Sequence, residues 1–483
     1  MTTTLSEARA TTGRPAARRQ VPEWATLLTI LAGTFMITLD FFIVNVAIPD
    51  MQNNLGASAE QIQWIVAGYS LAIAAGVITA GRLGDLFGRR RMYAIGIALF
   101  ALASLACGLS QSAGELVGAR IVQGVAAAIV TPQVLAIIST AFTGRALTKA
   151  FTAYGLTLGI AAVFGQLIGG LLIHADVLGL GWRACFLINL PIGALVLAVL
   201  PRVVPRSAGT GAARLDLTGM ALVTGALVAT VLPLIEGRAH GWPLWTIGSF
   251  ALAVVLFAAF GAYQIRLAGR GGDPLVHPDL MRSRGFRLGN LVQFVFWAGQ
   301  ASFFLVLALY LQVGRGLSAL ACGVVFTAIG GGYMATSVSA GRIAARIGRQ
   351  TVAVGAGIMV VGLVAMQVTV RSIGTSGSIG WLVLPLVIDG AGMGIALSPL
   401  ASTTLSFVPR SMAGAGSGLL STVMQVAGAV GIAIIGIVFY RPIDVAGGAP
   451  AAYPHAFALG LTFLAVIEAA VVVLTQLLPR SSD

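Results

Sequence analysis

Long apolar stretches alternate with short polar connectors along almost the whole chain. Each stretch is close to the roughly 20 residues that a helix needs to cross a bilayer. We place fourteen of them, at about 24–47, 60–80, 92–109, 115–138, 151–173, 184–201, 217–235, 244–265, 288–313, 319–340, 351–369, 380–399, 415–439 and 456–478. The runs are continuous rather than alternating, which excludes a transmembrane β-barrel. Because only helices and closed barrels satisfy the backbone in lipid, the pattern predicts an all-α polytopic membrane protein with 14 transmembrane helices.

Composition and the placement of charge agree with this prediction. With 57% hydrophobic and 9% charged residues, the chain cannot present a soluble surface. Of its 29 lysines and arginines, 23 lie on the side of the N-terminus, 5 lie on the other side, and Arg120 alone lies inside a span. This asymmetry predicts a multi-pass protein of the plasma (inner) membrane with both termini cytoplasmic. It also explains the net charge of +13 without a nucleic-acid partner.

Several classes of chemistry have no signal in the sequence. Residues 1–21 are polar and basic and predict a disordered cytoplasmic tail, followed by an uncleaved first span. Cys107, Cys185 and Cys322 lack metal-binding or redox spacing. We find no Walker loop, no metal cluster and no nucleophile–base arrangement in the short loops. We therefore expect no cofactor, no bound metal and no enzymatic activity.

One connector occurs twice. GRLGDLFGRRR, Gly81 to Arg91, returns 260 positions later as GRIAARIGRQ, Gly341 to Gln350, again between two apolar runs. The repeat predicts two bundles of six spans, an N-terminal one at 22–205 and a C-terminal one at 288–483. Residues 206–287 hold linkers and two extra central spans. Two such halves, with a substrate between them near mid-depth, are typical of transporters.

Four further segments carry a resemblance to a known family. They are LDFFIVNVAIP (Leu39 to Pro49), RIVQGVAAA (Arg120 to Ala128), LDLTG (Leu215 to Gly219) and EGRAHGW (Glu236 to Trp242). With the loop repeat, the chain from Trp24 to Leu478 resembles the fourteen-span drug:proton antiporter branch of the major facilitator superfamily (the EmrB/QacA type). The resemblance implies the major facilitator fold.

The resemblance also implies that the first loop is a cytoplasmic gate. Small residues there allow close helix approach, and charged ones can pair with neighbouring helix ends. Alternatively, the arginines only hold the loop inside. In the second copy Ala345 replaces the aspartate, so any lock is asymmetric. The gate residues are Gly81, Gly84, Asp85, Arg89 and Arg90.

Four ionisable residues lie inside spans, where isolated charge is costly. Asp40 and Arg120 lie at comparable depth and can pair; the resemblance implies proton coupling for them, and the alternative is a structural salt bridge. Asp389 and Glu468 lie near the midplane of the second half. Each can hold a cationic drug, carry a second proton, or be a protonated carboxyl that is hydrogen-bonded to a neighbouring helix.

The fifth span resembles the glycine-rich antiporter motif, with Gln166 in place of the usual proline. We expect its glycines to pack helices closely, with or without a role in antiport, and Gln166 to hydrogen-bond to a neighbour. The motif residues are Gly155, Gly159, Gly165, Gln166, Gly169 and Gly170.

The ninth span offers amides and aromatics at helical spacing. Such a surface suits an amphipathic ligand, although aromatic stripes in membrane helices also serve packing alone. The candidate substrate cavity comprises Gln293, Trp297, Gln300, Phe304, Asp389, Gln425 and Glu468.

These observations predict a proton-coupled efflux transporter for hydrophobic or cationic drugs, antibiotics or a natural product. Its partners are a small amphipathic substrate, protons and the lipid bilayer, and the proton-motive force drives it without a cofactor. A same-fold carrier of one metabolite, and a non-transporting membrane sensor or scaffold, remain alternatives. The sequence leaves the substrate open, and we expect a monomer.

Overall fold

The computed structural model describes residues 23–205, 215–409 and 412–479, so the predicted tail at 1–21 and most of the first linker lie outside the described residues. Every regular element within these ranges is helical, and 14 segments are long and apolar enough to cross a membrane. The helices are α1 (Glu23–Leu55), α2 (Ala59–Phe87), α3 (Arg89–Leu109), α4 (Ala113–Ala141), α5 (Gly144–Ala175), α6 (Ala184–Leu187), α7 (Asn189–Val203), α8 (Leu217–Ala239), α9 (Leu244–Gly269), α10 (Pro278–Arg282), α11 (Arg284–Leu309), α12 (Ala319–Ile347), α13 (Gln350–Ile373), α14 (Val383–Ser406), α15 (Ala413–Val445) and α16 (Tyr453–Leu477).

Local sequence explains where several helices begin and turn. Ser58 and Gln61 form a reciprocal capping box at the start of α2, which satisfies two of its free backbone amides. Gly88 separates α2 from α3 with a φ of 92°, and Gly348 separates α12 from α13 with a φ of 56°. These two glycines occupy the same place in the two loop copies, where a positive φ favours glycine.

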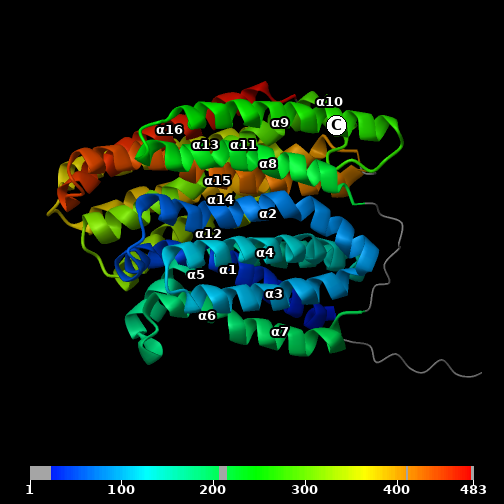
Figure 1. Ribbon diagram of the computed structural model, residues 1–483, viewed down its shortest axis with the longest axis horizontal. Helices are drawn as coiled ribbons and strands as arrows, with labels where there is room; N and C mark the ends of the chain where they lie inside the picture. Colours follow the sequence, from blue (N-terminus) through cyan, green and yellow to red (C-terminus); the bar gives the residue numbers. More distant parts are fainter. Residues whose placement is uncertain (1–22, 206–214, 410–411, 480–483) are drawn as a thin grey trace, which may run out of the picture.

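The long helices lie side by side as two groups (Figure 1). The first group, α1–α5 with α7, packs together in the lower part of the picture. The second group comprises α11–α16, of which α13, α15 and α16 lie in the upper part, behind α8 and α9. We call the end of the molecule where α1 begins and α16 ends the terminal face, and the opposite end the distal face. The chain crosses between these faces at every span.

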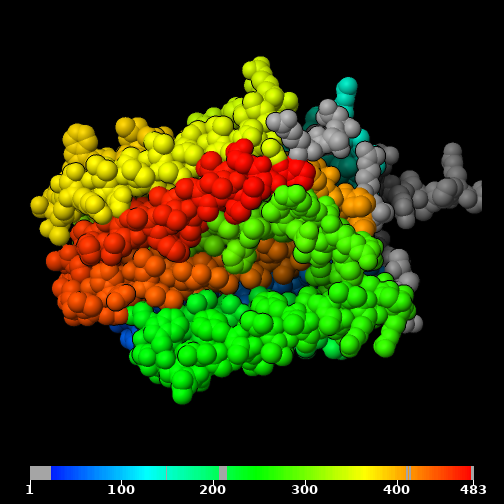
Figure 2. Space-filling model, turned by 90° about the horizontal axis from the view of Figure 1, so that it is seen from above, coloured from blue at the N-terminus to red at the C-terminus, as the bar shows by residue number. Residues whose placement is uncertain are grey.

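Two seams join the groups: α5 packs on α12, and α2 packs on α15. α8 covers the second seam, because it contacts both α2 and α15. Figure 2 shows α8 and α9 in green along one edge, beside the orange α15. Asp216 of the LDLTG segment caps α8 by accepting from the Gly219 amide at 2.7 Å, and it also accepts from Gln264 of α9 at 2.7 Å. This aspartate therefore fixes α9 against α8.

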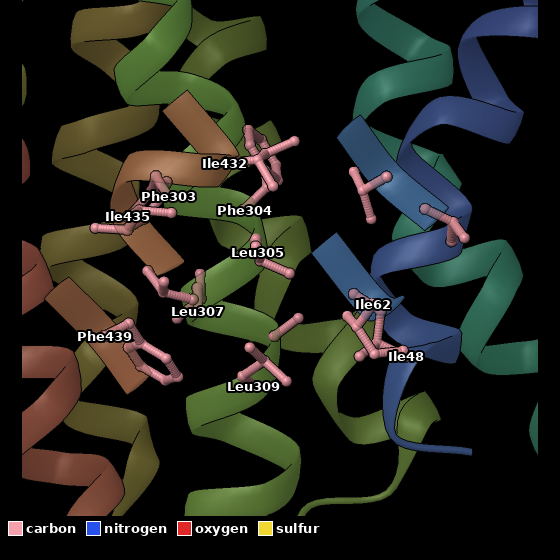
Figure 3. Close-up of a cluster of buried hydrophobic side chains, with 14 of the residues drawn as sticks. Ile48, Ile62, Phe303, Phe304, Leu305, Leu307, Leu309, Ile432, Ile435 and Phe439 are labelled. Atoms are coloured by element: carbon pink, nitrogen blue, oxygen red, sulfur yellow. The ribbon is translucent and has the colours of Figure 1, made fainter. Parts of the chain in front are cut away.

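A buried apolar cluster connects the groups in the distal half of the bundle. Figure 3 shows Ile48 and Ile62 of the first group facing Leu305 and Leu309 of α11. A further link is a hydrogen bond of 3.0 Å from Gln312 Nε2 to the backbone oxygen of Val46. The two groups are thus packed tightly together toward the distal face.

Candidate functional site

Asp40 lies within α1, fully buried, and receives hydrogen bonds from three side chains on two other helices. Arg120 Nη1 of α4 donates to Asp40 Oδ2 in a buried ion pair. Gln123 Nε2 of α4 and Asn189 Nδ2 of α7 each donate to Asp40 Oδ1 at 2.8 Å. The matched depths of Asp40 and Arg120 predicted this pairing; its role in proton coupling stays a prediction.

Arg120 is held in place on several sides. Its Nε donates to the backbone oxygen of Ile65 at 3.1 Å, and its Nη1 donates to Gln123 Oε1 at 2.6 Å. The guanidinium carbon lies 4.1 Å from the centre of the Tyr69 ring, a distance that allows a cation–π contact. Arg120 Nη2 is buried and has no hydrogen-bond partner among the described residues. A buried donor without a partner is costly, so the arrangement leaves one position open for an acceptor.

Three members of this cluster escaped the sequence analysis as functional residues. Ser104 Oγ of α3 accepts from Gln123 Nε2 at 2.7 Å and from Asn189 Nδ2 at 3.2 Å. Gln123 lies within the RIVQG segment, three residues after Arg120, so its position on the same helix face was a usable signal. Ser104 and Asn189 have no local signal, because only tertiary packing brings them to Asp40.

The chemistry available to the Asp40 cluster follows from these contacts. A carboxylate that accepts from an arginine and two amides is stabilised in its charged form. Arg120 and the two amides can therefore hold a charged carboxylate inside an apolar bundle.

The loop between α2 and α3 binds the ends of neighbouring helices. Asp85 pairs with Arg89 at 3.3 Å, and Arg89 Nη1 donates to the backbone oxygen of Ala136 in α4 at 3.0 Å. Arg90 Nη1 donates to the backbone oxygen of Val204, just past α7, at 2.9 Å. The expected contact with a neighbouring helix is present for Arg89, and Arg90 adds a second one; the ion pair of Asp85 with Arg89 lies within the same connector.

The glycines of this loop permit a close approach to α4. A side chain at Gly84 would clash with Gln133, whose Nε2 donates to the backbone oxygen of Ala80 at 2.8 Å. Gly81 faces Pro132 at an ordinary distance of 3.7 Å. A larger residue at Gly84 would therefore displace the Gln133 amide, whereas Gly81 leaves ordinary contact distance.

The glycines of α5 serve two different interfaces. Gly165 and Gly169 pack against α1, whereas Gly159 and Gly170 pack against α12 of the other group. At Gly155 the space is open, since a Cβ atom added there would meet no described atom within 4 Å. The motif thus lets α5 lie close to α1 and across the seam to α12.

The expectation for Gln166 was wrong in one respect. This side chain is fully buried, but neither of its polar atoms has a hydrogen-bond partner among the described residues. Its backbone packs closely on Gly323 of α12. The predicted hydrogen bond from Gln166 to a neighbour is therefore not present among the described residues.

The candidate substrate residues on α11 divide into two sets. Trp297 Nε1 donates to Gln293 Oε1 at 3.1 Å, and Trp297 is only partly buried. Phe304 is 6% exposed and stacks on Phe326 of α12, with ring centres 5.7 Å apart. Its ring also meets Phe42 of α1 at 5.2 Å. Phe304 therefore belongs to the packed region between the groups, whereas Trp297 retains some access.

The remaining candidates lie deeper in the second group. Glu468 Oε1 of α16 accepts from Gln300 Nε2 of α11 at 3.3 Å. Asp389 of α14 is 1% exposed, and neither of its oxygens has a hydrogen-bond partner in the part of the chain that the structure describes. Gln425 is partly buried on α15.

A hollow of about 440 Å³ lies elsewhere, along the terminal half of α5, where it is lined by Arg145, Lys149, Thr152, Ala153 and Leu156.

A second charged cluster, at the distal face, was also missed. Arg238 of α8 donates to Glu60 of α2 at 2.5 Å and pairs with Asp444 of α15. Beside it, Trp64 Nε1 of α2 donates to Glu236 Oε1 of α8 at 2.8 Å. Glu236 and Arg238 both belong to the EGRAHGW segment, so this motif links α8 to both sides of a seam.

Comparison with known proteins decides the family. The sequence profile of the Major Facilitator Superfamily matches residues 30–432, which is most of the chain. The chain belongs to the major facilitator superfamily. This confirms the resemblance drawn from the motifs, the all-helical fourteen-span fold and the expectation of a transporter rather than an enzyme.

Two relatives are similar over most of this chain. A probable actinorhodin transporter of Streptomyces coelicolor is 35% identical over 432 residues, which cover 88% of this chain and 73% of the relative. A cephamycin export protein of Amycolatopsis lactamdurans is 32% identical over 469 residues, covering 94% of this chain and 93% of the relative.

Solved structures of POT family transporters support the fold. A POT family transporter crystallised with a thioalcohol-conjugated peptide matches with a TM-score of 0.68. The match covers 95% of this chain and 97% of that one at 16% identity. At this identity the likeness concerns the fold alone.

Proposed function

We propose that this chain exports an amphipathic natural product or antibiotic in exchange for protons. The observation that carries the proposal is the Asp40 cluster, in which a buried carboxylate within a transporter fold is paired with an arginine. The names of the relatives, an actinorhodin transporter and a cephamycin exporter, support export of such compounds. Neither compound is assigned to this chain.

The proposed coupling depends on competition for Asp40. In one conformation Arg120 compensates its charge; in the other Arg120 is displaced and the carboxyl takes up a proton. A proton that returns inward contributes about 2.3 kcal/mol per 100 mV of membrane potential, in addition to any pH gradient. This energy can drive export against a concentration gradient.

We propose an orientation with both termini, and hence the terminal face, in the cytoplasm. The distribution of lysine and arginine supports it: the helix ends at the terminal face carry Arg82, Arg89, Arg145, Arg282 and Arg342. The structure is then closed toward the outside by the apolar cluster and by Arg238. The proposed halves are 22–205 and 288–483, with the two extra spans beside them.

The proposed substrate path lies between the halves and begins at the terminal face. Trp297 and Gln293 of α11, with Gln425 of α15, provide aromatic and amide groups for a large amphipathic molecule. The α2–α3 loop, through Asp85, Arg89 and Arg90, acts as the cytoplasmic gate. Phe304 closes the path on the outer side.

An efflux assay tests this function. The full chain is expressed in a host that lacks its own exporters, and retention of a panel of polyketide, β-lactam and cationic compounds is measured. Each compound is tested with and without an uncoupler. We expect efflux of at least one compound, abolished by the uncoupler and by Asp40→Asn.

Asp279→Asn is the matched control, because it removes a carboxylate that is half-exposed and lies in α10 outside the spans. It should leave efflux unchanged at equal membrane abundance. Efflux that survives Asp40→Asn would refute coupling through Asp40. Efflux that survives the uncoupler would refute proton exchange.

A further inference from the structure

The second half contains two buried carboxyl groups without a compensating cation among the described residues. Asp389 on α14 and Glu468 on α16 are each 1% exposed. The helices that carry them, α14 and α16, both pack on α11 and on α13. In the described ranges, no arginine, lysine or histidine forms an ion pair with either group.

The buried amide of Gln300 contacts one of these two carboxyl groups. Gln300 of α11 donates through Nε2 to Glu468 Oε1 at 3.3 Å, while its own Oε1 has no hydrogen-bond partner within the described part of the chain. Both oxygens of Asp389 and Glu468 Oε2 likewise lack a partner there. These three side chains therefore hold four oxygen acceptors that lack hydrogen-bond donors, and a bound proton would supply one.

The described parts of the surrounding helices contribute no other charge at this depth. Their arginines lie within two turns of a helix end, and Tyr333 turns its ring toward Gly159 of α5. Gly362 of α13 packs directly on the Asp389 backbone, with a Cβ position only 2.7 Å from the Asp389 nitrogen. The arginines in question are Arg284, Arg287, Arg342, Arg346, Arg371 and Arg441. The other titratable groups of these helices, also near the ends, are Tyr310, Cys322, Tyr440, Asp444, Tyr453 and His455.

The position of Gln300 relates this group of side chains to the Asp40 cluster. Gln300 follows Asp40 by 260 positions, the spacing that separates the two loop copies. In the repeat, α11 thus carries an amide where α1 carries the acid, and the acids of the second half come from α14 and α16 instead. Among the described residues, no counterpart of Arg120 accompanies them.

We propose that Asp389 and Glu468, with Gln300 hydrogen-bonded to Glu468, form a second proton-binding site, separate from the Asp40 cluster. Binding is a proton transfer only: an O–H bond forms at one carboxylate oxygen and its negative charge disappears, and the reverse step returns the proton to water. The enclosure excludes the positive group of a drug, because both side chains are almost fully buried. Gln300 lies three residues after Trp297 on α11, so protonation of Glu468 beside it can alter the proposed substrate path. This coupling rests on the proposed function, whereas proton binding itself does not.

Infrared difference spectroscopy of the purified full chain in lipid vesicles tests the site without any transport. Spectra are recorded as the pH is raised, in potassium and in sodium buffers. We expect the absorption of a protonated carboxylic acid to disappear with rising pH. Asp389→Asn and Glu468→Gln should each remove part of this signal, while Asp40→Asn and the surface variant Asp279→Asn should retain it.

Gln300→Leu keeps both carboxyls and provides a second test if either acid variant fails to fold. It removes the amide donor to Glu468, so it should shift the frequency of the signal without abolishing it. An unchanged signal in all three variants would overturn the proposal. So would a signal that persists at every pH, because it would indicate a permanently protonated structural group. Selective loss of the signal in sodium would overturn it in favour of a sodium site. Loss of efflux alone, with the titrating signal intact, would count only against the proposed function.

Discussion

The ion pair between Asp40 and Arg120 allows a quantitative prediction about stability. Both side chains are fully buried, so a variant that neutralises one of them leaves the other charge uncompensated. Breaking a buried pair in this way costs about 3–5 kcal/mol. We expect Arg120→Met, which keeps an unbranched side chain of similar length, and Asp40→Asn each to lose about this much free energy of unfolding.

The double variant should recover most of the loss. Asn at position 40 still accepts from Gln123 and Asn189, and Met at position 120 still packs against the Tyr69 ring. The remaining defects are the missing donors to the Ile65 backbone oxygen and to Gln123 Oε1, and a buried acceptor without a donor costs about 1–3 kcal/mol. Replacing a buried pair by neutral groups is otherwise close to neutral.

Apparent melting temperatures of purified protein in one detergent measure this cycle, with Asp279→Asn as the control. The expected order is wild type, then the double variant, then both single variants several degrees lower. The double variant should nevertheless be inactive in the efflux assay, since it has no coupling carboxyl. A double variant that is as unstable as the sum of the single variants would refute the coupling between these residues.

Three further predictions concern other parts of the molecule. Arg238→Gln removes the cation that bridges α2 and α15, so a cysteine introduced into the seam between these helices at the distal face should react faster with a labelling reagent. An unchanged labelling rate would contradict the bridging role. Asp85→Asn should reduce efflux without reducing membrane abundance, whereas normal efflux at equal abundance would leave the loop as a topological anchor only. Gly170→Val should lower membrane abundance, because its side chain would clash with the backbone of α12 and overpacking costs about 1–3 kcal/mol; the same change at the open position Gly155 should not.

The sequence predicted the helices well because lipid imposes a simple rule on composition. Fourteen apolar runs correspond to the fourteen candidate spans. The ends differ where a helix continues into polar surroundings: α1 extends from Glu23 to Leu55, well past the predicted limit at 47, through Asp50, Gln52 and Asn53. Hydropathy cannot detect such extensions, since water and neighbouring helices tolerate polar side chains beyond the apolar layer.

The functional clusters were predictable only in part. Asp40 and Arg120 stand out because a charge inside an apolar run is rare and needs a partner at the same depth. Ser104 and Asn189 are ordinary residues of α3 and α7. They lie 85 residues apart in the sequence, although their side chains are hydrogen-bonded to each other in the Asp40 cluster. No local pattern encodes a contact of this kind, because it depends on how the helices pack.

The two halves of the repeat share their backbone geometry but differ in the placement of their charges. Glycines keep their places in both loop copies, at Gly88 and Gly348, because the backbone geometry of the turn requires them. Charges do not keep their places: Ala345 replaces Asp85, and Gln300 replaces Asp40. The first half consequently holds an acid whose charge is compensated by Arg120, so protonation there requires a rearrangement of helices. The second half holds acids without a compensating charge among the described residues, but both are 1% exposed, so water must reach them before a proton can exchange. If both are proton sites, only protonation of Asp40 requires the loss of a compensating cation. We therefore propose the coupling step at Asp40 and a modulating step at Asp389 and Glu468.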